Sequence, residues 1–147
     1  MRFWDSSALI PLFVREAYSP IVGALAADDP DMMLWWASPV ECASAVHRLR
    51  REGVFTPEET IQVLAAIAAG SDAANVVQPG DALSALALRL LGVHPLRAAD
   101  ALQLAAAHLW TREKPGGKGF VCLDERLRTA AMLEGFEVLP GGLSTHR

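Results

Sequence analysis

Four acidic residues stand at positions where carboxylates can act together. Two of them directly follow short apolar segments, one begins a helical segment, and one is the single acid in an apolar helical turn. In chain order they are Asp5, Glu41, Asp100 and Asp124. Clustered carboxylates stay ionised only beside a counter-charge, and hard divalent cations supply one. If these side chains meet, they predict an open Mg²⁺ or Mn²⁺ site of the kind that hydrolyses phosphodiester bonds.

Short apolar segments alternate with helical segments and predict how these acids are positioned. Strands are expected at 2–4, 32–36, 120–123 and 136–139, with a short strand or connector at 75–77. Short, continuously apolar strands separated by helices are typical of a parallel sheet covered on both faces. The carboxyl ends of parallel strands share one edge of the sheet. Asp5, Glu41 and Asp124 are therefore expected at that edge.

Capping residues mark where the helices begin and end. Ser6 and Ser38 are expected N-caps, and the segment from Thr56 to Glu59 has the pattern of a capping box. Gly70 is expected to end the helix that begins there. Trp35 and Trp36 are expected to fill the core on opposite faces of their strand. The predicted helices span 8–14, 18–27, 39–51, 56–69, 81–91, 96–110 and 125–133.

Length and composition indicate one folded domain. The chain has 147 residues, of which 52% are hydrophobic and 20% charged, a composition that excludes a disordered chain. The longest run without a charged residue has twelve residues, Thr60–Ser71, and is too short for a membrane helix, which needs about 20. The first residues reach Asp5 without an apolar leader, so a cytoplasmic protein is expected.

Net charge leaves a nucleic-acid substrate open. Thirteen basic residues against seventeen acidic ones give a charge of −4, whereas nucleic-acid binders usually have a basic surplus. If four acids surround metal ions, the rest of the charge is balanced. Cys42 and Cys122 lie in apolar segments and are expected to be reduced core thiols. No cysteine or histidine spacing indicates a zinc site; the histidines are His47, His94, His108 and His146.

The segments around the four acids resemble the four motifs of PIN-domain ribonucleases. They are Asp5–Leu9, Ser38–Ala45, Arg97–Ala105 and Val121–Leu127, in this order. The resemblance extends from Phe3 to Leu139, and within the family the compact chain is most similar to VapC-type toxins of toxin–antitoxin pairs. One position departs from the family pattern, because Cys122 stands where a Thr or Ser is common. A thiol is a weaker hydrogen-bonding group than a hydroxyl.

This resemblance implies a single PIN-like domain over residues 1–147. Its fold would be a three-layer α/β sandwich with a central parallel sheet of about five strands flanked by helices. The implied activity is metal-dependent endoribonuclease cleavage of RNA. Asp5, Asp100 and Asp124 would hold Mg²⁺ or Mn²⁺, and Glu41 would act directly or through a water. The resemblance also implies a cognate antitoxin and a homodimer.

Other polar residues near the four acids are weaker candidates for binding substrate. Ser6 can bond a carboxylate or a phosphate, or it can simply cap its helix. Arg97 lies one helical turn before Asp100, and Arg126 follows Asp124, so both can reach a substrate phosphate. The predicted helices between 39 and 69 carry more apolar residues than one buried face requires, which indicates a surface for a partner.

Three alternatives stay open from the sequence. The chain can be a PIN-domain nuclease of RNA processing rather than a toxin, or a catalytically silent module that only binds a partner. A phosphotransfer domain built on an acidic pocket fits poorly. Such a site needs a lysine after a strand, and Lys118 precedes its predicted strand.

Overall fold

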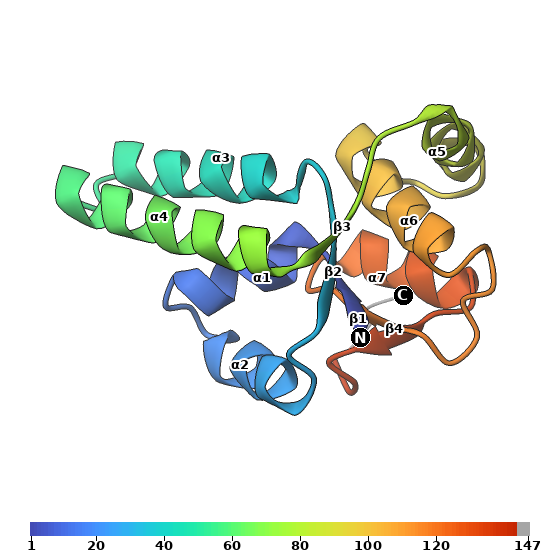
Figure 1. Ribbon diagram of the computed structural model, residues 1–147, viewed down its shortest axis with the longest axis horizontal. Coiled ribbons are helices and arrows are strands. Elements are labelled where there is room, and N and C mark those ends of the chain that lie inside the picture. Colours follow the sequence, from blue (N-terminus) through green and yellow to red (C-terminus); the bar gives the residue numbers. More distant parts are fainter. Residues whose placement is uncertain (144–147) are drawn as a thin grey trace.

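Five parallel strands form the centre of the computed structural model, which describes residues 1–143 (Figure 1). The sheet has the order β3-β2-β1-β4-β5, and every neighbouring pair is parallel. The parallel α/β class and the number of strands are therefore as predicted. The strands are β1 (Arg2–Trp4), β2 (Met32–Trp35), β3 (Asn75–Val77), β4 (Gly119–Val121) and β5 (Glu137–Leu139).

Helices cover both faces of this sheet. Figure 1 shows the first four helices on one side and the last three on the other, with the third and fourth running together as a long hairpin. The helices are α1 (Ser6–Phe13), α2 (Ser19–Asp28), α3 (Ser38–Arg51), α4 (Pro57–Ala73), α5 (Asp81–Val93), α6 (Ala98–Trp110) and α7 (Glu125–Leu133). No helix within residues 1–143 has both the length and the apolar character needed to cross a membrane.

The two faces of the sheet carry separate hydrophobic cores, because successive strand residues point to opposite sides. Phe3 and Phe120 stack with ring centroids 5.3 Å apart in the core beneath α5, α6 and α7. Trp4 and Val121, the next residue on each strand, pack in the core against α1, α3 and α4. Both Cys42 and Cys122 are buried and free, as predicted.

Both predicted serine caps are wrong, and for the same reason. Each strand passes into its helix one residue earlier than expected, so Asp5 is the N-cap of α1 and Ala37 occupies the cap position of α3. Ser6 and Ser38 become the first residues of their helices, and both are buried. Their hydroxyls are therefore free to bond side chains from other helices.

Two further expectations are wrong, one because a distant side chain decides the position and one because a strand ends earlier than expected. The helix starting at the Thr56 capping box, which the structure confirms, continues through Gly70 to Ala73. A Cβ on Gly70 would lie 2.9 Å from the Phe13 ring, so the glycine permits close packing of α1 and α4. Trp36 is 54% exposed, whereas Trp35 is buried, because β2 ends at Trp35.

Candidate active site

Each of the four acids lies at the start of a helix. Asp5 and Asp124 are the N-caps of α1 and α7, each with its side chain accepting a backbone N–H of its own helix. Glu41 and Asp100 lie in the first turns of α3 and α6. Negative charge is favoured at helix N-termini, because the free backbone N–H groups point toward it. Four separate helix starts therefore bring carboxylates to the carboxyl edge of the sheet.

Asp5 is the most deeply buried of the four. It is 3% exposed, and it accepts hydrogen bonds from the backbone N–H (3.1 Å) and the hydroxyl of Ser7. The Cys122 thiol lies 3.6 Å from the same carboxylate oxygen. Burial raises the pKa of Asp5 to about 6, and the negative charge of Asp100 adds to the rise, while the bonds from Ser7 oppose it. Asp5 forms no salt bridge with a cationic side chain within residues 1–143.

Glu41 is held by neutral donors from two other helices. The Ser6 hydroxyl donates to Oε2 at 2.8 Å, and the Gln103 amide donates to Oε1 at 3.2 Å. Burial raises the pKa of Glu41, and the charges of Asp5 and Asp100 raise it further, against the effect of the two hydrogen bonds. The side chain is fixed in place while its charge remains uncompensated.

Asp100 and Asp124 form the more open part of the site. Burial and the charge of Asp124 raise the pKa of Asp100, and the nearby Arg97 and Arg126 guanidinium groups oppose this rise. Asp124 is exposed and accepts the Leu127 N–H at 2.9 Å. Both arginines that the sequence singled out therefore lie in the electrostatic neighbourhood of an acid.

The four acids influence one another as an electrostatic chain. Charge repulsion links Asp5 with Glu41, Asp5 with Asp100, and Asp100 with Asp124. Within residues 1–143, no three His, Cys, Asp or Glu side chains lie close enough together to hold a metal ion. The chemistry of the donor set nevertheless fits a hard divalent cation, since it offers four carboxylates, none of which forms a salt bridge within residues 1–143.

Two polar residues at this site, Ser7 and Gln103, have roles that the sequence reasoning missed. Ser7 donates to Asp5, and its Oγ also accepts the Leu123 N–H at 2.9 Å, which ties α1 to the loop after β4. Gln103 donates to both Glu41 and Ser38. A polar residue three positions after Asp100 in an apolar helix was the available signal for Gln103.

A second charged cluster lies outside the four acids, where α5, α6 and α7 meet. Glu134, the C-cap of α7, contacts His94 at 2.8 Å and Arg89 at 3.2 Å through one oxygen. Its other oxygen lies 3.4 Å from the His108 ring. Burial lowers the pKa of His108, so the ring is neutral at pH 7 and this last contact is not an ion pair there. His146, the fourth histidine, lies outside the described residues.

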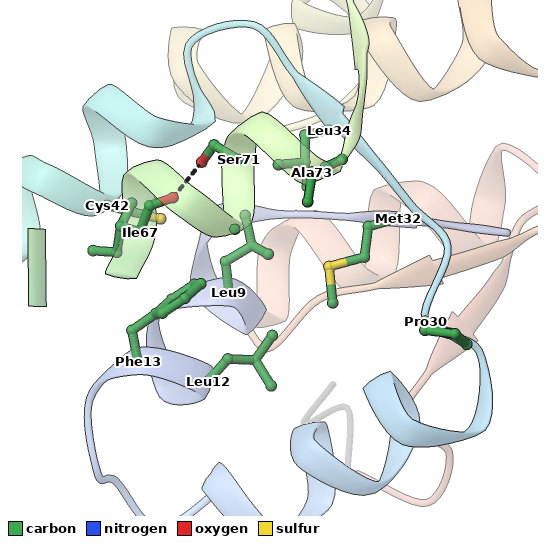
Figure 2. A pocket seen from close by; sticks show the side chains of 12 residues that line it. Leu9, Leu12, Phe13, Pro30, Met32, Leu34, Cys42, Ile67, Ser71 and Ala73 are labelled. Carbon is green, nitrogen blue, oxygen red and sulfur yellow. Dashed lines mark hydrogen bonds between the residues drawn. The ribbon is translucent and has the colours of Figure 1, made fainter. Parts of the chain in front are cut away.

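An apolar cavity of about 200 Å³ opens on the other face of the sheet (Figure 2). Figure 2 shows side chains of α1, β2 and α4 around it, among them Phe13, Met32 and Ile67. None of the four acids lines it. Burial raises the pKa of the Cys42 thiol, which also lines this cavity, to about 12, so the thiol stays protonated. Its lining is mostly apolar, so it offers no cluster of groups for catalysis.

No protein-family model matches the sequence, and no curated protein is significantly similar to it. Ten chains of solved structures have a similar fold, including the three that follow. The Mycobacterium tuberculosis toxin VapC20, described as cleaving the sarcin–ricin loop, aligns with a TM-score of 0.68 and 18% identity over 88% of this chain and 95% of its own. FitAcB from Neisseria gonorrhoeae gives 0.65 and 14% over 93% and 97%. A toxin–antitoxin complex from Klebsiella pneumoniae gives 0.58 and 16% over 99% and 98%. At these identities, the similarity shows the PIN-like fold expected from the sequence.

Proposed function

From the PIN-like fold shared with these proteins, we propose that the chain is a Mg²⁺- or Mn²⁺-dependent endoribonuclease and the toxin of a toxin–antitoxin pair. One observation carries the proposal. The helix starts bring Asp5, Glu41 and Asp100 within reach of one another's charge and Asp124 within reach of Asp100, and no salt bridge within residues 1–143 joins any of the four to a cation. Burial without a cationic partner is unfavourable for the Asp5 and Glu41 carboxylates, so a bound cation would account for their presence.

The residues divide the work as follows. Asp5, Asp100 and Asp124 would hold the metal, with Glu41 acting directly or through a water. A bound divalent ion activates water for attack on a phosphodiester and stabilises the leaving oxygen. Backbone N–H groups orient the two capping acids, Asp5 and Asp124, before any ligand arrives. Arg97 and Arg126 bind substrate phosphate, since both guanidinium groups lie near Asp100.

Cleavage of RNA by the purified chain tests this function. We expect cleavage with Mg²⁺ or Mn²⁺ and none with excess EDTA, and we expect Asp100→Asn to lower the rate by roughly 100-fold or more. The matched control is Asp72→Asn, which changes an exposed acid on α4 and should leave the rate unchanged. Full activity of Asp100→Asn, or cleavage that persists in EDTA, would exclude the proposed site.

A protein partner is part of the proposal. The similar Klebsiella pneumoniae structure is a toxin–antitoxin complex, and this chain exposes apolar side chains such as Val40 and Ile61 along the α3–α4 hairpin, with 67% and 68% exposure. We expect a homodimer and a complex with an antitoxin in the cytoplasm, where the RNA substrate is found. Light scattering after size exclusion measures the first, and co-purification with the product of an adjacent small reading frame tests the second.

Induction of the chain in cells separates a toxin from the alternatives. A toxin arrests growth, and Asp100→Asn abolishes the arrest. Cleavage in vitro without growth arrest would favour a nuclease of RNA processing. Growth arrest that Asp100→Asn retains, together with no cleavage, would favour a silent module that acts through a partner.

A further inference from the structure

Gln103 is fully buried on α6, and the sequence of this helix gives no packing reason for an amide there. Its exposed fraction is 0%, and the next three residues along the helix, Leu104, Ala105 and Ala106, are equally buried and apolar. Burying an amide costs free energy unless its polar atoms are hydrogen-bonded. The partners that Gln103 has are therefore informative about its role.

Both N–H groups of the Gln103 amide point to the start of α3. Nε2 donates to Glu41 Oε1 and to Ser38 Oγ, each at 3.2 Å. A carboxylate only accepts hydrogen bonds, so the amide nitrogen, and not the oxygen, must face Glu41. The amide oxygen is buried without a hydrogen-bond partner. An amide that only filled the core would be expected to have hydrogen-bond partners for both its nitrogen and its oxygen. The orientation of the Gln103 amide is therefore set by its bond to Glu41.

Both carboxylate oxygens of Glu41 therefore accept a hydrogen bond from another helix. Gln103 from α6 holds Oε1, and Ser6 from α1 holds Oε2 at 2.8 Å. A glutamate has three rotatable side-chain bonds, and two hydrogen bonds to separate oxygens restrict them. Both donors are neutral, so they orient the carboxylate and leave its negative charge in place. An arginine or lysine in the same position would cancel that charge.

The helix that carries Gln103 also carries Asp100, a second acid of the site. Asp100 and Gln103 are three residues apart, so they lie on the same side of the helix. One rigid helix thus supplies the Asp100 carboxylate and the group that orients Glu41. We infer that Gln103 is a positioning residue, which sets the Glu41 carboxylate relative to Asp100 for metal-dependent RNA cleavage. This inference rests on the proposed function.

Replacing Gln103 with methionine tests this role, because methionine has a similar length and no donor. We expect Gln103→Met to weaken Mn²⁺ binding, measured by calorimetry, and to lower kcat for RNA, each by roughly 10- to 100-fold, with little change in KM. In a Glu41→Gln background the same substitution should add less than about twofold, because residues that act through one another are not additive. Equal losses in both backgrounds would assign Gln103 a merely structural role.

Two further variants guard against misfolding. Gln103→His keeps a ring N–H donor and should retain more activity and Mn²⁺ affinity than Gln103→Met; equal losses in both would overturn the inference. Thr60→Val is the matched control, since it removes a different buried polar group, the Thr60 hydroxyl on α4, whose bond to the Thr56 carbonyl is 2.8 Å. It should leave cleavage and Mn²⁺ affinity unchanged.

A metal-free measurement separates this inference from the proposed function. In the NMR spectrum of the metal-free chain, the Gln103 side-chain amide should shift on Glu41→Gln and stay unchanged on Asp72→Asn. A wild-type chain that neither binds Mn²⁺ nor cleaves RNA would refute the proposed function, and with it the catalytic role of Gln103, even if this shift is seen. An active wild-type chain with an unshifted amide would overturn the inference alone.

Discussion

Asp5 combines two roles that conflict energetically. Its carboxylate caps α1 and bonds Ser7, which stabilises the turn from β1 into the helix. The same carboxylate is 3% exposed and has no cationic partner, and burial raises its pKa to about 6 from an ordinary 3.8. Functional sites often keep such destabilising groups because the chemistry requires them.

The pH dependence of stability should reveal this conflict. A carboxyl group whose pKa is raised on folding contributes stability at low pH that is lost as the pH rises through its folded value, here about 6. A rise of about two units corresponds to a destabilisation of up to ~3 kcal/mol at pH 7.5. We expect Asp5→Asn to raise the melting temperature of the metal-free protein at pH 7.5, and much less at pH 4.5, while abolishing cleavage.

The exposed Asp72→Asn variant is the control for this experiment and should shift neither melting temperature. If Asp5→Asn stabilised the protein equally at both pH values, its effect would not come from ionisation of the buried carboxylate.

At the scale of elements, the helices of the second layer are joined by polar contacts at their ends. Glu134 ends α7 and reaches His94, the C-cap of α5, and also the His108 ring on α6. Burial opposes ionisation of Glu134, but the hydrogen bonds from His94 and Arg89 outweigh it and lower its pKa. One carboxylate therefore links three helices that otherwise meet through apolar packing.

Removing this charge should loosen the layer. We expect Glu134→Gln to lower the free energy of unfolding by about 1–2 kcal/mol at pH 7, because hydrogen bonds to a charged group are lost. A carboxyl group with a lowered pKa contributes stability above its ordinary pKa that disappears as the pH falls through the folded value. Urea unfolding should thus show a smaller difference between variant and wild type in acid than at pH 7.

Glu137→Gln, on the exposed side of β5, is the comparison variant and should change little at either pH. RNA cleavage should be retained by Glu134→Gln, since this cluster contacts none of the four acids. A difference that grows toward low pH would contradict the role assigned to the Glu134 charge.

At the scale of the whole molecule, the net charge of −4 does not reveal where the basic residues lie. Arg97, at the N-cap of α6, and Arg126, in the first turn of α7, both lie near enough to Asp100 to lower its pKa. The basic residues at the end of α3, Arg48, Arg50 and Arg51, belong to the last turn of that helix, where cations complement its dipole. Binding of RNA phosphates should therefore depend on Arg97 and Arg126 and not on the basic residues at the end of α3.

The salt dependence of RNA binding tests this division. In an Asp100→Asn background, which prevents cleavage, Arg97→Gln and Arg126→Gln should each weaken binding and reduce the slope of log Kd against log salt by roughly 0.7–1. Arg50→Gln should leave the slope unchanged. The opposite ranking would place the RNA along α3 rather than beside α6 and α7.

The local sequence determined the alternation of strands and helices, and it also placed the acids at helix starts. Apolar runs such as Phe120–Val121 and the Thr56 capping box act over a few residues, so they can be identified without knowledge of the fold. The core position of Trp36, the N-cap at Ser6 and the helix end at Gly70 were wrong, because the end of β2, the Asp5 cap and the packed Phe13 ring decide these positions. The other prediction for Ser6, a bond to a carboxylate, is confirmed, since its hydroxyl donates to Glu41.

Tertiary structure alone decided the contacts that orient the acids. Gln103 and Glu41 are 62 positions apart, and Cys122 lies 117 positions from Asp5. Propensities and periodicity report on neighbours within one or two turns, whereas these contacts depend on the order of the strands and on the packing of α6 against the sheet. The sequence thus determined which residues have the chemistry, and the fold decided how they are held, because hydrogen bonds between distant segments exist only once the chain is packed.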